Sequence, residues 1–232
     1  MVSLHKIVQA KRQIEAFVSH TPCVLSTRIS TRTDALVYLK KENLQITGAY
    51  KVRGAFNKIA NLSSEQKQKG VVAASAGNHA QGVAISAGHF GIKASIIMPE
   101  AAPLSKVAGT KALGACVILK GNNFDEAYEY ALEYAKEHNM TFIHPFDDEL
   151  VQAGQGTIAI EMLDEIPDLD YIVVPVGGGG LISGVASYAK QLNPNIKIIG
   201  VSAKGAPAMY ESFKARSKHN SSFVRTIADG IA

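Results

Sequence analysis

One lysine of the sequence, Lys51, stands among small residues in the segment TGAYKVRGA, residues 47–55. A lysine amine without its extra proton can bind an aldehyde covalently or act as a general base. In water its pKa of about 10.4 keeps it protonated at neutral pH, so such chemistry requires a pocket that changes its environment. The alternative is an ordinary helix start with a solvated cation.

Four consecutive glycines follow an apolar run in the segment PVGGGGLISGV, residues 175–185. They are Gly177, Gly178, Gly179 and Gly180, and Leu181 comes next. Without Cβ atoms the backbone N–H groups can approach an anion closely, and the start of a following helix adds unpaired donors. Because the pattern is neither a Walker loop nor G-x-G-x-x-G, it favours a phosphate group over a dinucleotide. A tight strand-to-helix turn without a ligand is the alternative.

A second turn, ASAGNHAQGVA at residues 74–84, brings several hydrogen-bond donors to one helix start. The donors belong to Ser75, Gly77, Asn78 and His79. Such a set suits a carboxylate, although Ser or Asn at this place is more often only a helix cap. A third segment, AGQGTIAIE at residues 153–161, places two glycines before a predicted helix, and close backbone packing is their expected role.

Apolar, β-rich runs alternate with helical patterns along the chain, which predicts an α/β fold with parallel, open, twisted sheets and helices on both faces. We expect strands at residues 35–40, 71–74, 94–98, 115–120, 141–144, 171–176 and 196–202. We expect helices at residues 4–18, 53–62, 78–90, 103–113, 123–137, 150–163, 181–192 and 206–217. Ligands of such folds bind at the carboxyl ends of the strands, where the glycine-rich and polar turns lie.

Composition excludes several classes of protein. The 232 residues are 47% hydrophobic, which is enough for a packed core, yet no run approaches the length of a membrane span. A net charge of +4 without basic clusters argues against nucleic-acid binding. Two unpaired cysteines, Cys23 and Cys116, and an N-terminus unlike a signal peptide point to a reduced, cytoplasmic setting. The histidines follow no zinc-binding pattern.

Together these segments resemble the fold-type II pyridoxal-phosphate enzymes, the family of threonine dehydratases (threonine ammonia-lyases), serine dehydratases and serine racemase. The likeness is greatest to the threonine dehydratases and runs from about residue 4 to the last residue. It rests on the segments TGAYKVRGAFNKI, SAGNHAQGVA, VGGGGLISG, AGQGTIAIE and TIADG. The resemblance implies a pyridoxal 5'-phosphate cofactor and a lyase that converts L-threonine to 2-oxobutanoate and ammonia, or serine to pyruvate.

By position, the resemblance also implies a role for each residue named above. Lys51 is the catalytic lysine that holds the cofactor as a Schiff base, Tyr50 flanks the cofactor ring, and Asn78 binds the 3'-oxygen of that ring. The backbone of the glycine run holds the phosphate, through Gly177, Gly178, Gly179, Gly180 and Leu181. The substrate carboxylate is bound by Ser75, Gly77, Asn78 and His79.

Two domains and a longer chain are further implications of the resemblance. A large cofactor-binding domain comprises residues 1–67 and 148–232, and a small mobile domain, residues 68–147, is inserted into it. The family continues beyond TIADGIA, so we expect a fragment that lacks its C-terminal part, including the residue that pairs with the cofactor's ring nitrogen. Ser221 and Ser222 do not replace that residue. An isolated polypeptide of residues 1–232 is therefore expected to be poorly stable, and if the chain is complete, weak cofactor binding and little or no lyase activity should follow.

Other interpretations stay open beside the threonine dehydratase. A serine racemase needs a second acid/base, which a serine two positions before the loop asparagine supplies; this chain has Ala76 there. The chain also has Ser202 and Ala208 where the racemase pattern has acidic metal ligands, so we predict elimination without racemisation and no metal site. Another fold-type II enzyme, an inactive truncated homologue and a non-enzymatic phosphate- or nucleotide-binding protein are the remaining alternatives.

The family also implies a homo-oligomer, either a dimer or a tetramer, and a nucleotide or amino-acid effector. Its members act in isoleucine biosynthesis or threonine catabolism.

Overall fold

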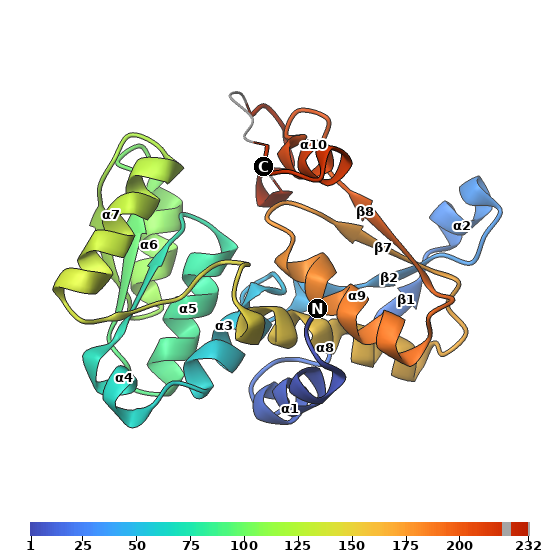
Figure 1. Cartoon of the computed structure of the whole chain (residues 1–232), viewed down its shortest axis with the longest axis horizontal. Coiled ribbons are helices and arrows are strands. Elements are labelled where there is room, and N and C mark those ends of the chain that lie inside the picture. Colours follow the sequence, from blue (N-terminus) through green and yellow to red (C-terminus); the bar gives the residue numbers. More distant parts are fainter. Residues whose placement is uncertain (220–223, 232) are drawn as a thin grey trace.

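A computed structural model describes residues 1–219 and 224–231, so Ser221 and Ser222 lie outside the described residues. Figure 1 shows the arrangement of the elements. The helices are α1 (Leu4–Ile14), α2 (Thr27–Thr33), α3 (Lys51–Ala60), α4 (Ser64–Lys69), α5 (Asn78–His89), α6 (Leu104–Ala112), α7 (Phe124–Glu137), α8 (Glu149–Glu165), α9 (Gly180–Leu192) and α10 (Ala208–Ala215), with short 3-10 turns η1 (Glu42–Leu44) and η2 (Asp229–Ile231). The strands are β1 (Cys23–Leu25), β2 (Tyr38–Lys40), β3 (Val71–Ala74), β4 (Ala94–Met98), β5 (Cys116–Leu119), β6 (Thr141–Phe142), β7 (Tyr171–Pro175) and β8 (Lys197–Val201).

A four-stranded parallel sheet, in the order β5-β4-β3-β6, carries the polar turn at the end of β3. Alternate residues of β3 enter two different cores. Val71 and Ala73 pack with α5, whereas Val72 and Ala74 pack with α7. Because both faces are covered, every residue of this strand is buried and apolar. The predicted α/β class and the predicted bounds of β3 and β4 are confirmed.

The second parallel pair, β7 and β8, leads into the glycine run and is covered on one face. Ile172 and Val174 pack in a core formed with α1, α8 and α9. On the opposite face Tyr171 and Val173 are 50% and 62% exposed. Helices on both faces are therefore found for the four-stranded sheet, and one face of β7 lies open among the described residues.

Short elements account for most differences from the sequence-based expectation. Strand β1 pairs with β2 in an antiparallel register, and three residues are too few to show an alternating pattern. Helix α4 is polar on all sides, so periodicity does not reveal it; its signal is the capping box between Ser63 and Gln66. Helix α1 ends at Ile14, earlier than expected, although Phe17 and Val18 beyond it still pack in the core.

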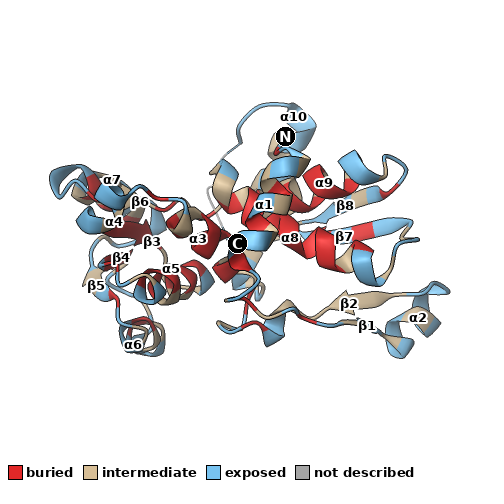
Figure 2. Ribbon diagram, turned by 90° about the horizontal axis from the view of Figure 1, so that it is seen from below, coloured by how far each residue is buried: buried red, intermediate tan, exposed pale blue. Residues whose placement is uncertain are grey.

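Helix α8 is the centre of the core that supports the site. It packs against α1, α3 and α9, and Figure 2 shows how much of it is buried. In Figure 1 the four-stranded sheet with α4 to α7 lies on one side of the molecule, and α1, α9, α10 and the β7–β8 pair lie on the other. The domain boundaries at residues 67/68 and 147/148 stay a prediction. Within the described residues no helix combines the length and the hydrophobicity that crossing a membrane would require.

Candidate functional site

Lys51 is the first residue of α3, and its side chain is half-buried. Its Nζ donates a hydrogen bond to the carbonyl oxygen of Pro145, 2.8 Å away, and lies 5.6 Å from the centre of the Tyr50 ring. Burial lowers the pKa of Lys51 to about 8. A substantial fraction of the amine is therefore neutral near physiological pH, and a neutral amine is the form that attacks an aldehyde.

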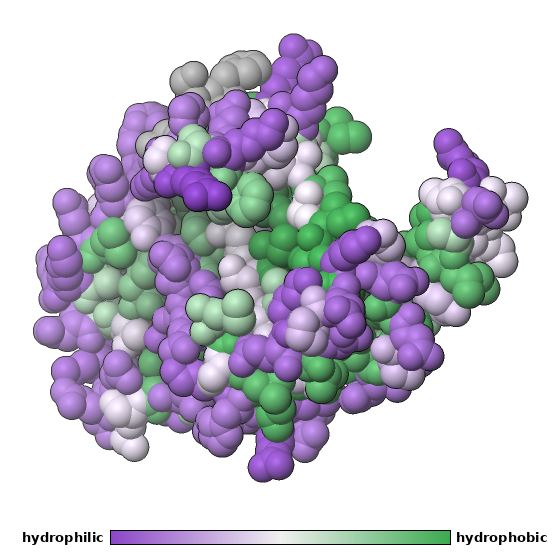
Figure 3. Space-filling view, turned by 45° about the vertical axis from the view of Figure 1, so that its right-hand side comes forward, coloured by the Kyte–Doolittle hydropathy of each residue, from purple (hydrophilic) through white to green (hydrophobic). Residues whose placement is uncertain are grey.

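Tyr50 immediately precedes the lysine and packs against the same core as Leu181 of α9. Burial raises the pKa of its phenol to about 12, so the ring is uncharged at neutral pH. Tyr50 also borders a groove of about 1180 Å³. The groove is lined by β1, β2, α2 and the open face of β7. Figure 3 shows this hollow with hydrophobic side chains (green) along its wall. Tyr50 thus lies between the core and a hydrophobic groove.

The polar turn lies at the start of α5, directly after β3. Ser75 and Asn78 differ in environment: the Ser75 hydroxyl accepts a hydrogen bond from the N–H of Gly77 at 3.1 Å, whereas Asn78 is exposed. A Cβ at Gly77 would meet no atom within 4 Å, so this backbone faces open space. Gly82, one turn further, lies against the backbone of Lys51 and Val52, where a Cβ would be 3.1 Å from the nitrogen of Val52. This close approach brings the polar turn beside the lysine.

His79 points inward rather than toward the open side of the turn. It is 3% exposed, and its Nε2 donates to the carbonyl oxygen of Ile143 at 2.9 Å. Burial, and then the charge of Lys51, lower the pKa of His79 to about 3, so the ring is neutral. Its Nδ1 has no partner within the described part of the chain. In this tautomer Nδ1 of the neutral ring is a hydrogen-bond acceptor. His79 can therefore donate a hydrogen bond to a substrate carboxylate only through its backbone N–H.

The glycine run leaves β7 and starts α9 at Gly180. Gly179 has a φ of +84°, a conformation that a side chain would strain. A Cβ at Gly178 would lie 2.3 Å from the Phe146 ring, and a Cβ at Gly180 would lie 2.8 Å from the Cα of the same phenylalanine. The loop therefore requires glycine at three of its four positions.

Residues 143–148 connect the lysine, the polar turn and the glycine run. The predicted strand 141–144 ends at Phe142, so Ile143 and His144 belong to this connecting segment instead. The carbonyl oxygen of Ile143 accepts from His79, that of Pro145 accepts from Lys51, and Phe146 packs on the glycine run. His144 holds the turn, because its Nδ1 accepts from the backbone N–H groups of Phe146 and Asp147. The segment lies between β6 and α8. The one feature of its sequence that could have pointed to it is an aromatic residue, Phe146, directly after His-Pro.

The glycines of the third segment, AGQGTIAIE, do not precede a helix as expected but lie within one. Gly154 and Gly156 lie inside α8, where they allow two other helices to approach closely. A Cβ at Gly154 would lie 2.5 Å from the carbonyl oxygen of Arg53 on α3, and a Cβ at Gly156 would lie 3.0 Å from that of Gly184 on α9. The expected close backbone packing is present. Helix α8 thereby sets the distance between the lysine helix and the helix of the glycine run.

The glycine run is suited to a phosphate. Among the residues described, the N–H groups of Gly177 to Leu181 donate to no backbone or side-chain acceptor. They lie at the amino end of α9, where the helix dipole adds a favourable field for an anion. An aldehyde bound by Lys51 and a phosphate held at this loop are the two groups of pyridoxal phosphate, so the residues present fit the predicted cofactor. No group of three or more metal-ligating side chains is found in the described part of the chain.

Comparison with known proteins agrees with this chemistry. Residues 14–232 match the family described as "Pyridoxal-phosphate dependent enzyme". The "L-threonine ammonia-lyase" of Thermotoga maritima is 51% identical over 232 residues, which are 100% of this chain and 58% of the relative. The chain thus spans little more than half the length of that curated relative.

Two solved structures share the fold along almost the whole chain. Maize serine racemase is 38% identical with a TM-score of 0.96, and the match covers 99% of this chain and 70% of the racemase. The processed form of threonine deaminase isoform 2 from Solanum lycopersicum is 42% identical with a TM-score of 0.91, and the match covers 98% of this chain and 68% of the deaminase. The predicted family is confirmed: the chain belongs to the pyridoxal-phosphate dependent enzymes.

Proposed function

We propose that this chain forms the cofactor-binding part of an L-threonine ammonia-lyase. The observation that carries the proposal is the amine of Lys51, whose pKa is lowered to about 8 and which contacts the segment that also packs on the glycine run. The 51% identity to a curated L-threonine ammonia-lyase supports threonine as the substrate.

The residues of the chain then have distinct tasks. The N–H groups of Gly177 to Leu181 bind the phosphate, and Tyr50 lies against the ring. Lys51 holds the aldehyde and, once released by the substrate, removes the proton from the Cα of threonine. Ser75, Gly77 and Asn78 orient the substrate carboxylate from the start of α5, together with the backbone N–H of His79. The bound cofactor supplies the electron sink for the carbanion at the Cα.

The overall reaction balances without an external oxidant or reductant. The Cα proton and the β-hydroxyl leave threonine as water, and water enters again as ammonia is released. The products are 2-oxobutanoate and ammonia. Serine would give pyruvate by the same sequence of bond changes.

A direct test is to mix the 232-residue chain with pyridoxal phosphate, reduce with borohydride, and locate the adduct by peptide mass spectrometry. The expected adduct is on Lys51, and Lys51→Ala should abolish it, with Lys58→Ala as a matched lysine control. An adduct of equal yield in Lys51→Ala would refute the proposal. A threonine-to-2-oxobutanoate assay on the same sample, and on a full-length relative, then measures the lyase activity itself.

Racemisation is the second candidate function, because maize serine racemase has the same fold at a TM-score of 0.96. The position that would need a hydroxyl is Ala76, whose methyl group packs toward the core of the four-stranded sheet. A methyl group carries no exchangeable proton, which favours elimination. Chiral analysis of L-serine after incubation separates the two: D-serine formed as fast as pyruvate would favour a racemase.

The remaining family properties belong to the same proposal. We propose a cytoplasmic enzyme of threonine metabolism, in either isoleucine biosynthesis or threonine catabolism, that acts as a homo-oligomer and responds to a nucleotide or amino-acid effector. Residues 68–147 form its small mobile domain, and residues 1–67 with 148–232 belong to its large domain. Sedimentation analysis of this protein with and without AMP or isoleucine tests the oligomer and the effector together.

A further inference from the structure

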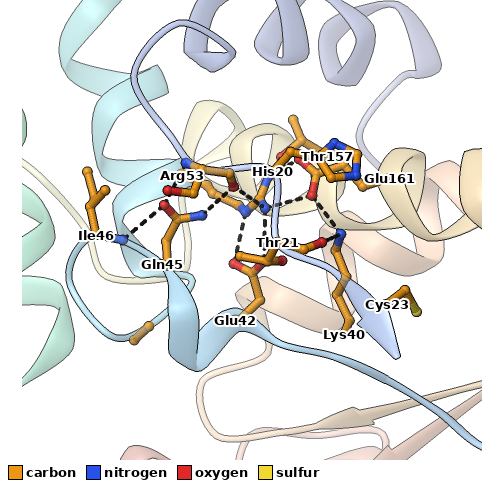
Figure 4. A network of polar contacts seen from close by, with 12 residues as sticks. His20, Thr21, Cys23, Lys40, Glu42, Gln45, Ile46, Arg53, Thr157 and Glu161 are labelled. Atoms are coloured by element: carbon orange, nitrogen blue, oxygen red, sulfur yellow. Dashed lines mark hydrogen bonds and ion pairs between the residues drawn. The ribbon is translucent and has the colours of Figure 1, made fainter. Parts of the chain in front are cut away.

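A buried ionic cluster lies directly behind the lysine. Its centre is Arg53 of α3, two residues after Lys51, which is 0% exposed. The guanidinium binds Glu42 of η1 at 2.9 Å through both Nε and Nη2, and Glu161 of α8 at 2.7 and 2.8 Å through Nη1 and Nη2. Figure 4 shows the arginine between the two carboxylates. A guanidinium held bidentately on two sides has a fixed orientation.

Further contacts hold the two carboxylates themselves. Lys40 of β2 lies 2.8 Å from Glu161 and Lys11 of α1 lies 3.3 Å from it. Although burial alone would raise it, the bonds and charges of Arg53 and Lys40 lower the pKa of Glu161 to about 2. Glu42 accepts a hydrogen bond from the hydroxyl of Thr21. Glu161 therefore stays charged over the working range of pH, and the cluster anchors α3 directly to η1 and α8.

The geometry of α3 links this anchor to the lysine. Successive residues of a helix differ by about 100°, so Arg53 projects about 200° around the axis from Lys51, on nearly the opposite side. Lys51 reaches Pro145 on one side, while Arg53 is held by η1 and α8 on the other. A rotation of α3 by about 10° would move a nitrogen that lies about 8 Å from the axis by roughly 1.4 Å. That shift is enough to break the 2.8 Å bond to Pro145.

We propose that Arg53 is a positioning residue for Lys51: clamped between Glu42 and Glu161, it fixes the rotation of the first turn of α3 and so the direction of the lysine side chain. This inference rests on the proposed role of Lys51 in holding the cofactor. Displacements of about 1 Å in an active site cost on the order of 100-fold in rate, so a clamp of this kind has a measurable effect.

A purely structural cluster would stabilise the fold without affecting the lysine, and the chain offers a matched control for that case. Asn57 also joins α3 to α8, because its Nδ2 donates a hydrogen bond to the carbonyl oxygen of Leu150 at 2.7 Å. It lies about one helical turn beyond Arg53, on the same side of α3. Asn57→Ala should lower the unfolding temperature and leave the reaction of Lys51 unchanged.

The decisive variant is Arg53→Lys, because it keeps the positive charge while a single ammonium group cannot hold both carboxylates bidentately. The readout is the pH dependence of borohydride-trapped pyridoxal phosphate on Lys51, measured with the 232-residue chain. The other titratable groups around the amine are Tyr50, His79 and His144, and the His79 and His144 pKa values are lowered by burial while that of Tyr50 is raised. All three are neutral at about pH 8, so the midpoint reports on Lys51.

For Arg53→Lys we expect the midpoint to rise from about 8 toward the ordinary lysine value of about 10.4, and the trapping rate at pH 8 to fall by about 10- to 100-fold. If Arg53→Lys does not fold, Glu161→Gln, which keeps the size and one acceptor oxygen, should shift the midpoint in the same direction.

A wild-type midpoint and rate in the folded variant, with only a lower unfolding temperature, would overturn the positioning role and leave the proposed function intact. A wild-type chain that forms no adduct on Lys51 would instead refute the proposed function, and the positioning role with it.

Discussion

Replacing Gly154 by alanine should push α3, the helix that carries Lys51, away from α8. The added Cβ would lie 2.5 Å from the carbonyl oxygen of Arg53, 2.6 Å from the Cα of Gly54 and 2.8 Å from the carbonyl carbon of Arg53. Ordinary van der Waals contact begins at 3.4 Å, so the added Cβ and the carbonyl oxygen of Arg53 would be 0.9 Å too close. All three opposing atoms belong to the backbone, and no side-chain rotation relieves the overlap.

The size of the effect follows from two opposing contributions. Overpacking a close-fitting core typically costs 1–3 kcal/mol, and a rigid backbone partner places this site at about 3 kcal/mol. Alanine in a helix interior regains about 1 kcal/mol relative to glycine. The expected net loss is about 2 kcal/mol, which corresponds to a fall in unfolding temperature of roughly 4–8 °C for a chain of this size.

Calorimetry or circular dichroism of the two variants Gly154→Ala and Gly109→Ala provides the measurement. Gly109 lies within α6, and its nearest contact for a Cβ is the Gln81 side chain at 3.9 Å. Gly109→Ala should therefore be neutral or stabilising by up to about 1 kcal/mol. If Gly154→Ala unfolds at or above the wild-type temperature, the close approach of α3 and α8 is not tight and the reasoning fails.

Three further predictions concern the site itself. Because burial lowers the pKa of Lys51 to about 8, the rate of aldehyde trapping should rise about tenfold per pH unit below 8 and level off above it; a rise that continues to about pH 10.4 would show an ordinary, solvated lysine. Gly179→Ala, at a φ of +84°, should cost about 1–2 kcal/mol of stability and weaken binding of pyridoxal phosphate in a fluorescence titration, whereas unchanged binding would exclude a role of this loop. Ala76→Ser in this chain should permit D-serine formation that the wild-type chain lacks, and equal racemisation by both forms would contradict the assignment of that position.

The local features of the site could be predicted from the sequence. Runs such as VVAA are buried on both faces of a parallel sheet, and their apolar composition marks the strand without knowledge of its neighbours. The glycine run is informative for a similar reason, because glycine adopts φ values such as the +84° of Gly179 without the steric cost of a side chain. The prediction that Lys51 is the reactive group came from its place in a recognisable motif.

The tertiary structure decided how these parts act together. The bond between Lys51 and Pro145 spans 94 positions of the sequence, and the one between Arg53 and Glu161 spans 108. Taken alone, an arginine two residues after a lysine would be expected to be a solvated cation, yet Arg53 is fully buried. Local patterns determine which residues can bind a phosphate or an aldehyde. The lowered pKa and the direction of Lys51 depend on desolvation and on contacts between distant helices, which only the folded chain brings together.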